Sequence, residues 1–468
     1  MPSIIIFFLL ILSSAWAGEK YMAVMGVGGE PGNKETTIFD KEIDNLGGYI
    51  SRAHDTNLVL SLNGGHSKTE QIISRELERP NVKNQPFIES SFDSIIADYE
   101  KKIENGQISS GDQLILYIST HGARKMGSEK SHNIALTGGE AVNLNDLKGA
   151  STVSLDKLEK LITLAESKGV KLGILDFSCH SGNSLNLNRP NTCIISASGP
   201  NHFGYANFGS TFAARLINGR SLEDAYLETL KSRDEPSFPM ISTPTGIEIQ
   251  DELYQKLGYY LYNYDENPSH DKLAKRLENE VANNRCEETN QNFNDLIATI
   301  SNMRSLASSS KDRKKYDALT RELQEYHKFL NEIKEDLVKY DLPSLKKKEK
   351  FCTNNQCQEW TLQEILRSDF QAEIDVMNEY YKDASGWTLT WKNAYNKNLE
   401  QAKARQTEFL LQNPRYAGLK NFFKDRSRLE RDTWSKASKV ARAFRDVYLK
   451  EYKSRDDSRP NPCRDIVL

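Results

Sequence analysis

The chain has 468 residues, with 62 Lys and Arg against 65 Asp and Glu, and this length is too great for one ordinary domain. A hydrophobic content of 38% and a charged content of 27% exclude a collagen-like or generally disordered chain and permit a packed core. The near-neutral charge gives no indication of a nucleic-acid partner, and six cysteines are too few for a disulfide-built scaffold of this length.

The first 17 residues have the pattern of an export signal. Residues 4–12 are an unbroken apolar run, far shorter than the roughly 20 residues that span a bilayer. Ala15-Trp16-Ala17 is the small-x-small pattern that signal peptidases accept. We therefore predict cleavage after Ala17 and a secreted or periplasmic protein with no integral membrane span; the alternative is an uncleaved interfacial anchor.

Residues 20–250 alternate short apolar runs with amphipathic patterns. Runs rich in β-branched and apolar residues predict strands over residues 21–27, 57–62, 113–119, 171–177, 192–197 and, more weakly, 240–249. Apolar residues at helical spacing predict helices over residues 43–54, 68–77, 91–105, 154–168, 212–217 and 222–231. This alternation is typical of an α/β domain, with a mostly parallel sheet and helices on both faces.

Residues 251–468 have helical periodicity with few interruptions. Helices are predicted over residues 271–282, 291–306, 311–340, 361–382, 387–412 and 419–453. Only Gly258, Gly386 and Gly418 of the 27 glycines lie beyond residue 250. Because glycine destabilises helix interiors, this distribution predicts a domain boundary near residue 250 and a separate α-helical domain over 251–468.

The five cysteines other than Cys179 divide into two predicted bridges and one free thiol. Cys352 and Cys357 have no partner pair at zinc spacing, so a local disulfide is favoured in an oxidising compartment. Cys286 and Cys463 could form a second bridge between the start and the end of the helical region. Cys193, within a predicted core strand, would then stay free.

Two of the predicted strands run directly into reactive side chains. Residues 113–120 lead into His121-Gly122, and residues 171–178 lead into Cys179. Because parallel strands end at the same edge of a sheet, neighbouring strands would bring an imidazole and a thiol together. A thiolate is the nucleophile for acyl transfer, an imidazole can protonate the leaving amine, and backbone N–H groups can hold an oxyanion. The pattern predicts a cysteine-peptidase site.

The spacing of these motifs and their residue types are similar to those of a known group of peptidases. An apolar strand ending in His-Gly, followed 58 residues later by one ending in Asp-Phe-Ser-Cys-His-Ser-Gly, resembles the caspase-like clan of cysteine peptidases. The Cys-His-Ser-Gly motif is most similar to metacaspases, and the exported layout with a helical C-terminal region is more similar to legumains. The resemblance implies Cys179 as nucleophile, His121 as general acid and base, and the N–H groups of Gly122 and Cys179 as oxyanion hole.

The specificity pocket departs from the metacaspase pattern. Metacaspases carry an acidic residue two positions before the nucleophile, where strand alternation points it into the pocket for a basic P1 side chain. Here that position is Phe177, and Asp176 should face the other side of the sheet. The sequence therefore indicates no P1 preference. We interpret Asp176 as a hydrogen-bonded strand-end residue and His180 as a structural loop residue.

These features predict an exported cysteine endopeptidase that cleaves a protein or peptide substrate through a thioester on Cys179. No cofactor or metal site is predicted. Similarity to legumains implies that the helical domain docks over the cleft of the same chain and regulates it. Two alternatives remain: a secreted helical binding or adhesion protein carried by a catalytically inactive caspase-like scaffold, and a transpeptidase or ligase of the legumain type.

Overall fold

A computed structural model describes most of the chain: residues 18–28, 40–63, 82–123, 127–143, 148–204, 206–217, 219–232, 237–257, 286–339, 348–353, 356–361, 417–455 and 458–468, with isolated positions between 71 and 75, at 125 and between 392 and 411. The predicted signal segment over residues 1–17 and the predicted helix over 271–282 lie outside the described residues. So do most of the helices predicted over 68–77 and 361–382.

The chain forms two compact units. One comprises Met1–Tyr264, Met303–Tyr316 and Ala441–Leu468, and the other comprises Asp265–Asn302 and Asp317–Val440. The first unit therefore includes two segments from beyond residue 250, Met303–Tyr316 and Ala441–Leu468. Helical periodicity in the sequence predicts which segments are helices, but it does not predict the unit to which each helix belongs.

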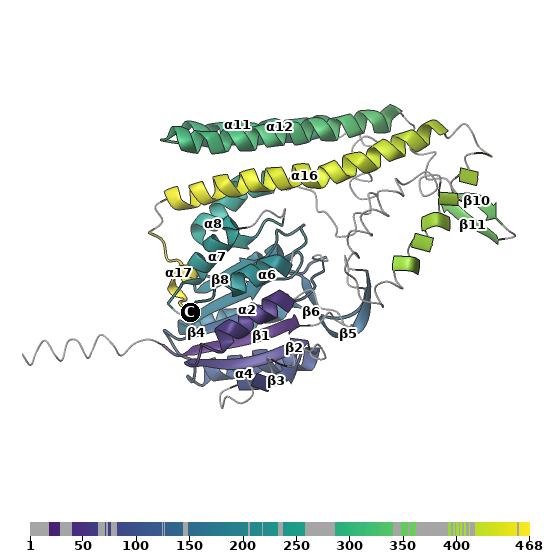
Figure 1. The fold of residues 1–468 in the computed structure, drawn as a ribbon. Helices are drawn as coiled ribbons and strands as arrows, with labels where there is room; N and C mark the ends of the chain where they lie inside the picture. Colours follow the sequence, from purple (N-terminus) through teal and green to yellow (C-terminus); the bar gives the residue numbers. More distant parts are fainter. Residues whose placement is uncertain are drawn as a thin grey trace, which may run out of the picture. The chain divides into compact units, whose positions relative to one another are not determined.

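The first unit contains a seven-stranded sheet with the order β3-β2-β1-β4-β7-β8-β9 (Figure 1). All neighbouring strands are parallel except β8 and β9, which confirms the predicted mostly parallel sheet. The strands are β1 (Lys20–Gly28), β2 (Thr56–Asn63), β3 (Val82–Pro86), β4 (Gln113–Ile118), β7 (Lys171–Asp176), β8 (Thr192–Ser196) and β9 (Met240–Ile241).

Helices cover both faces of this sheet (Figure 1). On one face, helices α4 (Glu89–Glu104) and α5 (Glu159–Lys168), with the short helix η1 (Leu155–Leu158) before α5, share a hydrophobic core with β1, β4 and β7. The other face carries α2 (Asp40–Ile50), α6 (Ala206–Ala213) and α7 (Leu222–Lys231). Because the central strands are buried on both sides, their sequences are nearly continuous apolar runs, which is why they were predictable.

Several elements differ from the predicted pattern. The helix predicted over 212–217 lies earlier in the chain, since α6 spans Ala206–Ala213. The weak strand prediction over 240–249 is wrong beyond Ile241, because α8 (Pro244–Ile249) begins there, with Thr243 capping its N-terminus and Pro244 in its first turn. The edge strand β3 was not predicted because its sequence is polar. The antiparallel hairpin of β5 (Asn133–Asn143) and β6 (Lys148–Ser154) was also missed, since β5 is interrupted by two glycines.

Beyond residue 250 the predicted helical character is confirmed in α11 (Cys286–Ser305), α12 (Ser310–Lys339) and α16 (Ala417–Ser454). The remaining elements are short: η2 (Ser181–Leu187), η3 (Gln250–Tyr254), α9 (Gln255–Leu257), α17 (Pro462–Asp465) and the hairpin of β10 (Lys348–Thr353) and β11 (Gln356–Thr361). That hairpin pairs Cys352 with Cys357 in register, and the disulfide between them stays a prediction.

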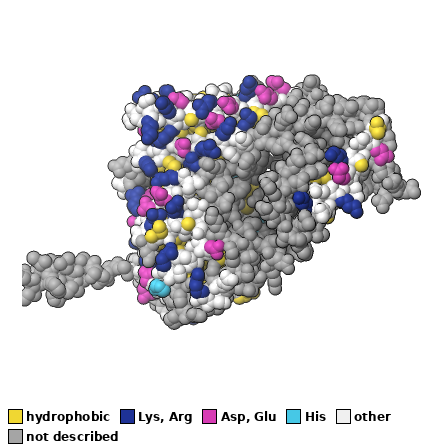
Figure 2. Space-filling model, viewed as in Figure 1, with side chains coloured by type: hydrophobic (Ala, Val, Ile, Leu, Met, Phe, Trp, Pro, Cys, Tyr) yellow, Lys and Arg dark blue, Asp and Glu magenta, His cyan; other side chains and the backbone are white. Residues whose placement is uncertain are grey.

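The part of the surface that the structure describes carries charges of both signs. On the face drawn in Figure 2, basic and acidic side chains are interspersed over the described residues, in keeping with the near-neutral net charge. Among the helices that the structure describes, none has the length and apolar character needed to span a bilayer.

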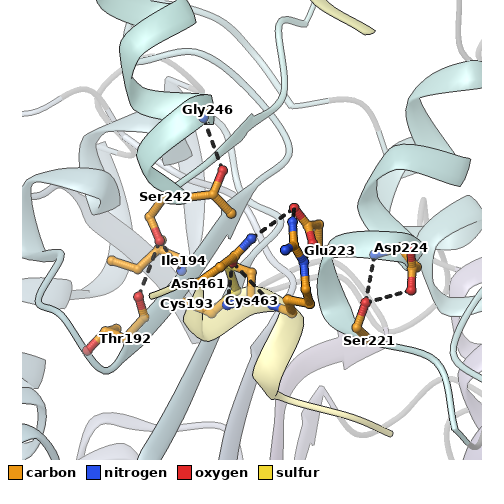
Figure 3. The surroundings of a disulfide bond; sticks show 12 residues. Thr192, Cys193, Ile194, Ser221, Glu223, Asp224, Ser242, Gly246, Asn461 and Cys463 are labelled. Carbon is orange, nitrogen blue, oxygen red and sulfur yellow. Dashed lines mark hydrogen bonds and ion pairs between the residues drawn. A yellow bond between two sulfur atoms is a disulfide. The ribbon is translucent and has the colours of Figure 1, made fainter. Parts of the chain in front are cut away.

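The C-terminal segment is bonded to the sheet by a disulfide. Cys463 on α17 is bonded to Cys193 on β8, with Cα atoms 4.7 Å apart (Figure 3). The predicted Cys286–Cys463 bridge and the predicted free Cys193 are therefore both wrong. The prediction paired cysteines within the helical region, whereas the chain returns from that region to the sheet before it ends.

Polar contacts reinforce this attachment. Glu223 on α7 accepts hydrogen bonds from Asn461 (2.9 Å) and from Arg464 Nε (2.8 Å). The last residue pairs with the loop before α7, because the Leu468 N–H donates to the carbonyl of Arg220 at 2.9 Å. The Val467 N–H donates to Gln113 Oε1 at 2.8 Å. Since Gln113 begins β4, the C-terminus lies at the amino edge of the sheet.

Candidate active site

The two predicted catalytic side chains follow neighbouring strands at the carboxyl edge of the sheet. Strands β4 and β7 are paired in parallel, and Ile118 is in register with Asp176. His121 and Cys179 each lie three residues beyond this pair, and both are partly exposed. The adjacency of the two strands, on which the sequence-based prediction depended, is therefore present.

The segments after these strands meet at glycines. A Cβ atom built on Gly122 would lie 2.1 Å from the carbonyl oxygen of Cys179, so the two backbones are in direct contact and only glycine fits. A Cβ atom on Gly204 would lie 2.7 Å from the carbonyl oxygen of Ser178. The Cys179 thiol lies 3.7 Å from the carbonyl oxygen of Gly204, within hydrogen-bonding distance for sulfur. Glycines on two loops therefore enclose the cysteine backbone.

His180 makes the turn that follows the cysteine. Its φ of 62° lies in the left-handed region, which is costly for a residue other than glycine and occurs often at functional sites. Its N–H donates to the carbonyl of His202 at 2.8 Å, and its ring lies against Phe203 with centroids 5.2 Å apart. These contacts agree with the predicted structural role of His180, and the turn directly follows Cys179.

The start of β5 holds the His121 segment in place. The Ala135 N–H donates to the carbonyl of His121 at 2.9 Å, and the Ala123 N–H donates to the carbonyl of Asn133 at 2.8 Å. The Thr120 hydroxyl donates to the carbonyl of Ala135 at 2.9 Å. Because β5 was not predicted from the sequence, its hydrogen bonds to the His121 segment were not predicted either.

Ser178, the residue before Cys179, belongs to a buried polar network that the sequence did not indicate. The Ser178 hydroxyl donates to Asp176 Oδ1 at 2.7 Å and lies 2.8 Å from His132 Nε2. Asp176 Oδ2 accepts a hydrogen bond from Ser184 and lies 3.5 Å from His132 Nε2. Ser131 Oγ lies 3.3 Å from His132 Nδ1. All five side chains are buried. The hydrogen bonding predicted for Asp176 is thus present.

This network is not a second nucleophilic centre. Ser178 and Asp176 both face the same nitrogen of His132, whereas a serine-histidine-carboxylate triad uses one ring nitrogen for each partner. Burial lowers the pKa of His132, and the nearby Asp176 opposes this shift without overcoming it. The imidazole is therefore neutral near pH 7, but its contacts with Ser178 and Asp176 through one nitrogen do not have the arrangement of a catalytic triad.

Phe177 belongs to an aromatic cluster on the opposite face of β7. Its ring makes edge contacts with Tyr117, Phe208 and Phe212, with centroids 5.1, 5.5 and 5.1 Å apart. The side chain is buried. This position therefore supplies no carboxylate for a basic P1 side chain, and no P1 preference follows from it.

A buried carboxyl group lies beside this cluster. Glu42 on α2 accepts a hydrogen bond from the Tyr117 hydroxyl at 2.6 Å. Desolvation by burial raises the pKa of Glu42 to about 7, while the hydrogen bond from Tyr117 acts in the opposite direction. The folded protein therefore binds a proton at this position at pH values where the unfolded chain has lost it.

We expect this proton to make stability depend on pH. A folded-state pKa above the unfolded value favours folding fully below the unfolded pKa of 4.5, and this contribution is lost as pH rises through about 7. At about 1.4 kcal/mol per pKa unit, the loss is about 3 kcal/mol. Urea unfolding at pH 5 and pH 9 should show this loss in wild type and not in Glu42→Gln. Asp44→Asn, an exposed change on the same helix, should leave the pH dependence unchanged, and equal pH dependence in wild type and Glu42→Gln would contradict the prediction.

Neither a metal-ligand cluster among the described residues nor a similarity to known proteins indicates what this site does. Among the residues that the structure describes, no group of three or more His, Cys, Asp or Glu side chains is arranged to hold a metal ion. The chain matches no protein-family model and no curated protein. The geometry of the site is therefore what indicates its function.

Proposed function

We propose that this chain is a cysteine endopeptidase of the caspase-like type, with Cys179 as nucleophile and His121 as general acid and base. The observation that supports this most strongly is the contact of Gly122 with the Cys179 backbone, at the carboxyl edge of two neighbouring parallel strands. It brings the residue after His121 against the proposed nucleophile. The partial exposure of both side chains is what access by a substrate requires.

The proposed reaction proceeds by acyl transfer. The Cys179 thiolate attacks the carbonyl carbon of the scissile peptide bond, and the N–H groups of Gly122 and Cys179 stabilise the oxyanion. Protonated His121 donates its proton to the departing amine as the C–N bond breaks, which leaves a thioester on Cys179. Neutral His121 then accepts a proton from the attacking water, and the carboxylic acid leaves as the thiol is regenerated.

The proposed compartment is outside the cytoplasm, either secreted or periplasmic. The Cys193–Cys463 disulfide supports this, since disulfides persist in oxidising environments. The proposed substrate is a protein or peptide.

A positional-scanning peptide library tests the activity. Wild type should cleave a subset of the peptides, and Cys179→Ala and His121→Ala should each lose detectable cleavage. Iodoacetamide should alkylate folded Cys179 faster at pH 7 than it alkylates a small thiol with an ordinary pKa of about 8.5. Cleavage that persists in Cys179→Ala, or a wild type that cleaves nothing and labels slowly, would refute the proposal.

Deleting the residues after Ile249 would not isolate the proposed regulatory function of the helical region. Ending the chain at Ile249 would also remove Cys463 and the contacts of α17 with Glu223. A single engineered cleavage within Asp317–Val440 keeps every segment of the sheet-containing unit and is the appropriate comparison with the intact chain.

A further inference from the structure

The segment Ser131–Ala135 contacts both loops of the candidate site. At one end, Ala135 bonds to the backbone of His121; at the other, His132 lies 2.8 Å from the Ser178 hydroxyl. We infer that this segment is a brace, and that His132 and Ser178 are positioning residues that set the orientation of the Cys179 peptide relative to His121. This inference rests on the proposed function, because it assigns a task within the same site.

The protonation of the network follows from its contacts. The Ser178 hydroxyl has one proton, which it donates to Asp176 Oδ1. It can therefore only accept from His132, so His132 carries its proton on Nε2 and presents Nδ1 as an acceptor to the Ser131 hydroxyl. The carboxylate also receives hydrogen bonds from Ser184 and from the Ser178 N–H. These donors satisfy the buried oxygens of Asp176, and the arrangement has little freedom to rearrange.

The main chain of Ser178 connects this hydrogen-bond network to the proposed oxyanion hole, because the Ser178 carbonyl and the Cys179 N–H belong to the same peptide group. The Ser178 carbonyl accepts a hydrogen bond from Ser198 Oγ at 3.4 Å and lies against Gly204. The side chain of the same residue is held by Asp176 and His132. In a trans peptide the N–H points opposite to the preceding carbonyl. Fixing Ser178 at both its carbonyl and its side chain therefore fixes the direction of the Cys179 N–H.

The brace also connects the two loops through one short piece of backbone. Gly122 is bridged to Ile134, only two residues from His132. A displacement of His132 would therefore move the support of the His121 segment and the support of Cys179 together. Catalysis by acyl transfer is sensitive to such movement, because a misplacement of about 1 Å can lower the rate about 100-fold.

If His132 and Ser178 contributed only to stability, their replacement would lower the free energy of unfolding without a specific loss of kcat. Removing any buried hydroxyl costs stability, and Ser242 offers a matched case in the same unit. It is buried, accepts a hydrogen bond from the Ile194 N–H at 2.8 Å and donates to the Thr192 carbonyl at 3.3 Å. Thr192 begins β8, so this pair lies toward the amino end of that strand. Ser242→Ala thus reports the effect of lost stability alone.

The test compares Ser178→Ala, His132→Leu, His132→Gln and Ser242→Ala with wild type. For each we measure kcat and KM on a peptide from the library, urea unfolding, and the alkylation rate of Cys179 by iodoacetamide with the labelled peptide identified by mass. Ser178→Ala and His132→Leu should lower kcat about 10- to 100-fold with little change in KM, and should change the alkylation rate of Cys179. His132→Gln keeps an N–H donor near the same reach and should recover most of kcat. Ser242→Ala should keep wild-type kcat.

The two proposals fail in distinguishable ways. A wild type that cleaves nothing and labels slowly, or a Cys179→Ala variant that still cleaves, refutes the proposed function. The alkylation rates of the variants relative to wild type then decide on the brace alone. If wild type cleaves and Ser178→Ala retains the kcat and alkylation rate of Ser242→Ala, the brace is refuted while the peptidase proposal stands. Should His132→Leu fail to fold, Ser178→Ala, which removes one hydroxyl, gives the same decision.

Discussion

Replacing both Cys193 and Cys463 by alanine is expected to lower the free energy of unfolding of the sheet-containing unit by about 3–5 kcal/mol. The disulfide joins residues 270 positions apart, and closing so long a loop removes much conformational freedom from the unfolded chain. The native state keeps its other contacts with the C-terminal segment, so the loss should appear as easier unfolding and not as a different fold. Urea unfolding of the variant and of oxidised wild type measures it.

The controls separate the bond from the side chains. Wild type treated with a reductant should lose a similar amount, while the double alanine variant should not respond to the reductant. Arg464→Ala removes a contact with Glu223 (2.8 Å) but keeps the disulfide, so it should cost less than the double variant. An oxidised wild type and a double variant that unfold at the same urea concentration would show that the bond contributes nothing.

The strands at the centre of the sheet were predictable because a strand buried on both faces has a nearly continuous apolar sequence. Residues 114–118 of β4 and 172–176 of β7 are buried throughout, and each run is apolar apart from Gly173 and the terminal Asp176. The edges have weaker patterns. Strand β3 is polar, and β9 has only two residues. Pairing with a neighbour, which the local sequence does not specify, makes these segments strands.

The candidate site was predictable in part for the same reason. His121 and Cys179 follow buried strands, so their place in the chain indicated their place in the fold. His132 follows no predicted element, and its contact with Ser178 depends on a hairpin that was not predicted. The pairing of Cys193 with Cys463 depends on the return of the chain after the intervening unit. Contacts between segments so distant in sequence produce no periodic pattern of residues from which they could be predicted.

Gly122→Ala is expected to lower the proposed peptidase activity at least 100-fold and to lower the free energy of unfolding by about 1–3 kcal/mol. The added Cβ would lie 2.1 Å from the Cys179 carbonyl oxygen and 3.0 Å from its carbonyl carbon. Both atoms are backbone, so no side-chain rotation relieves the clash and one of the two loops must move. Movement on the scale of 1 Å changes the spacing of His121 and Cys179, which costs about 100-fold in rate. Peptide cleavage and urea unfolding measure the two effects.

Gly48→Ala provides the matched control. Gly48 lies within α2, and a Cβ there would meet only the end of the Arg52 side chain at 3.6 Å. Alanine in a helix interior is favoured over glycine by about 0.5–1 kcal/mol, so this variant should be slightly more stable and equally active. If Gly122→Ala resembles Gly48→Ala in activity, the two loops do not need their close contact for catalysis. The main structural support for pairing His121 with Cys179 is then lost, because that support is the meeting of Gly122 with the Cys179 backbone.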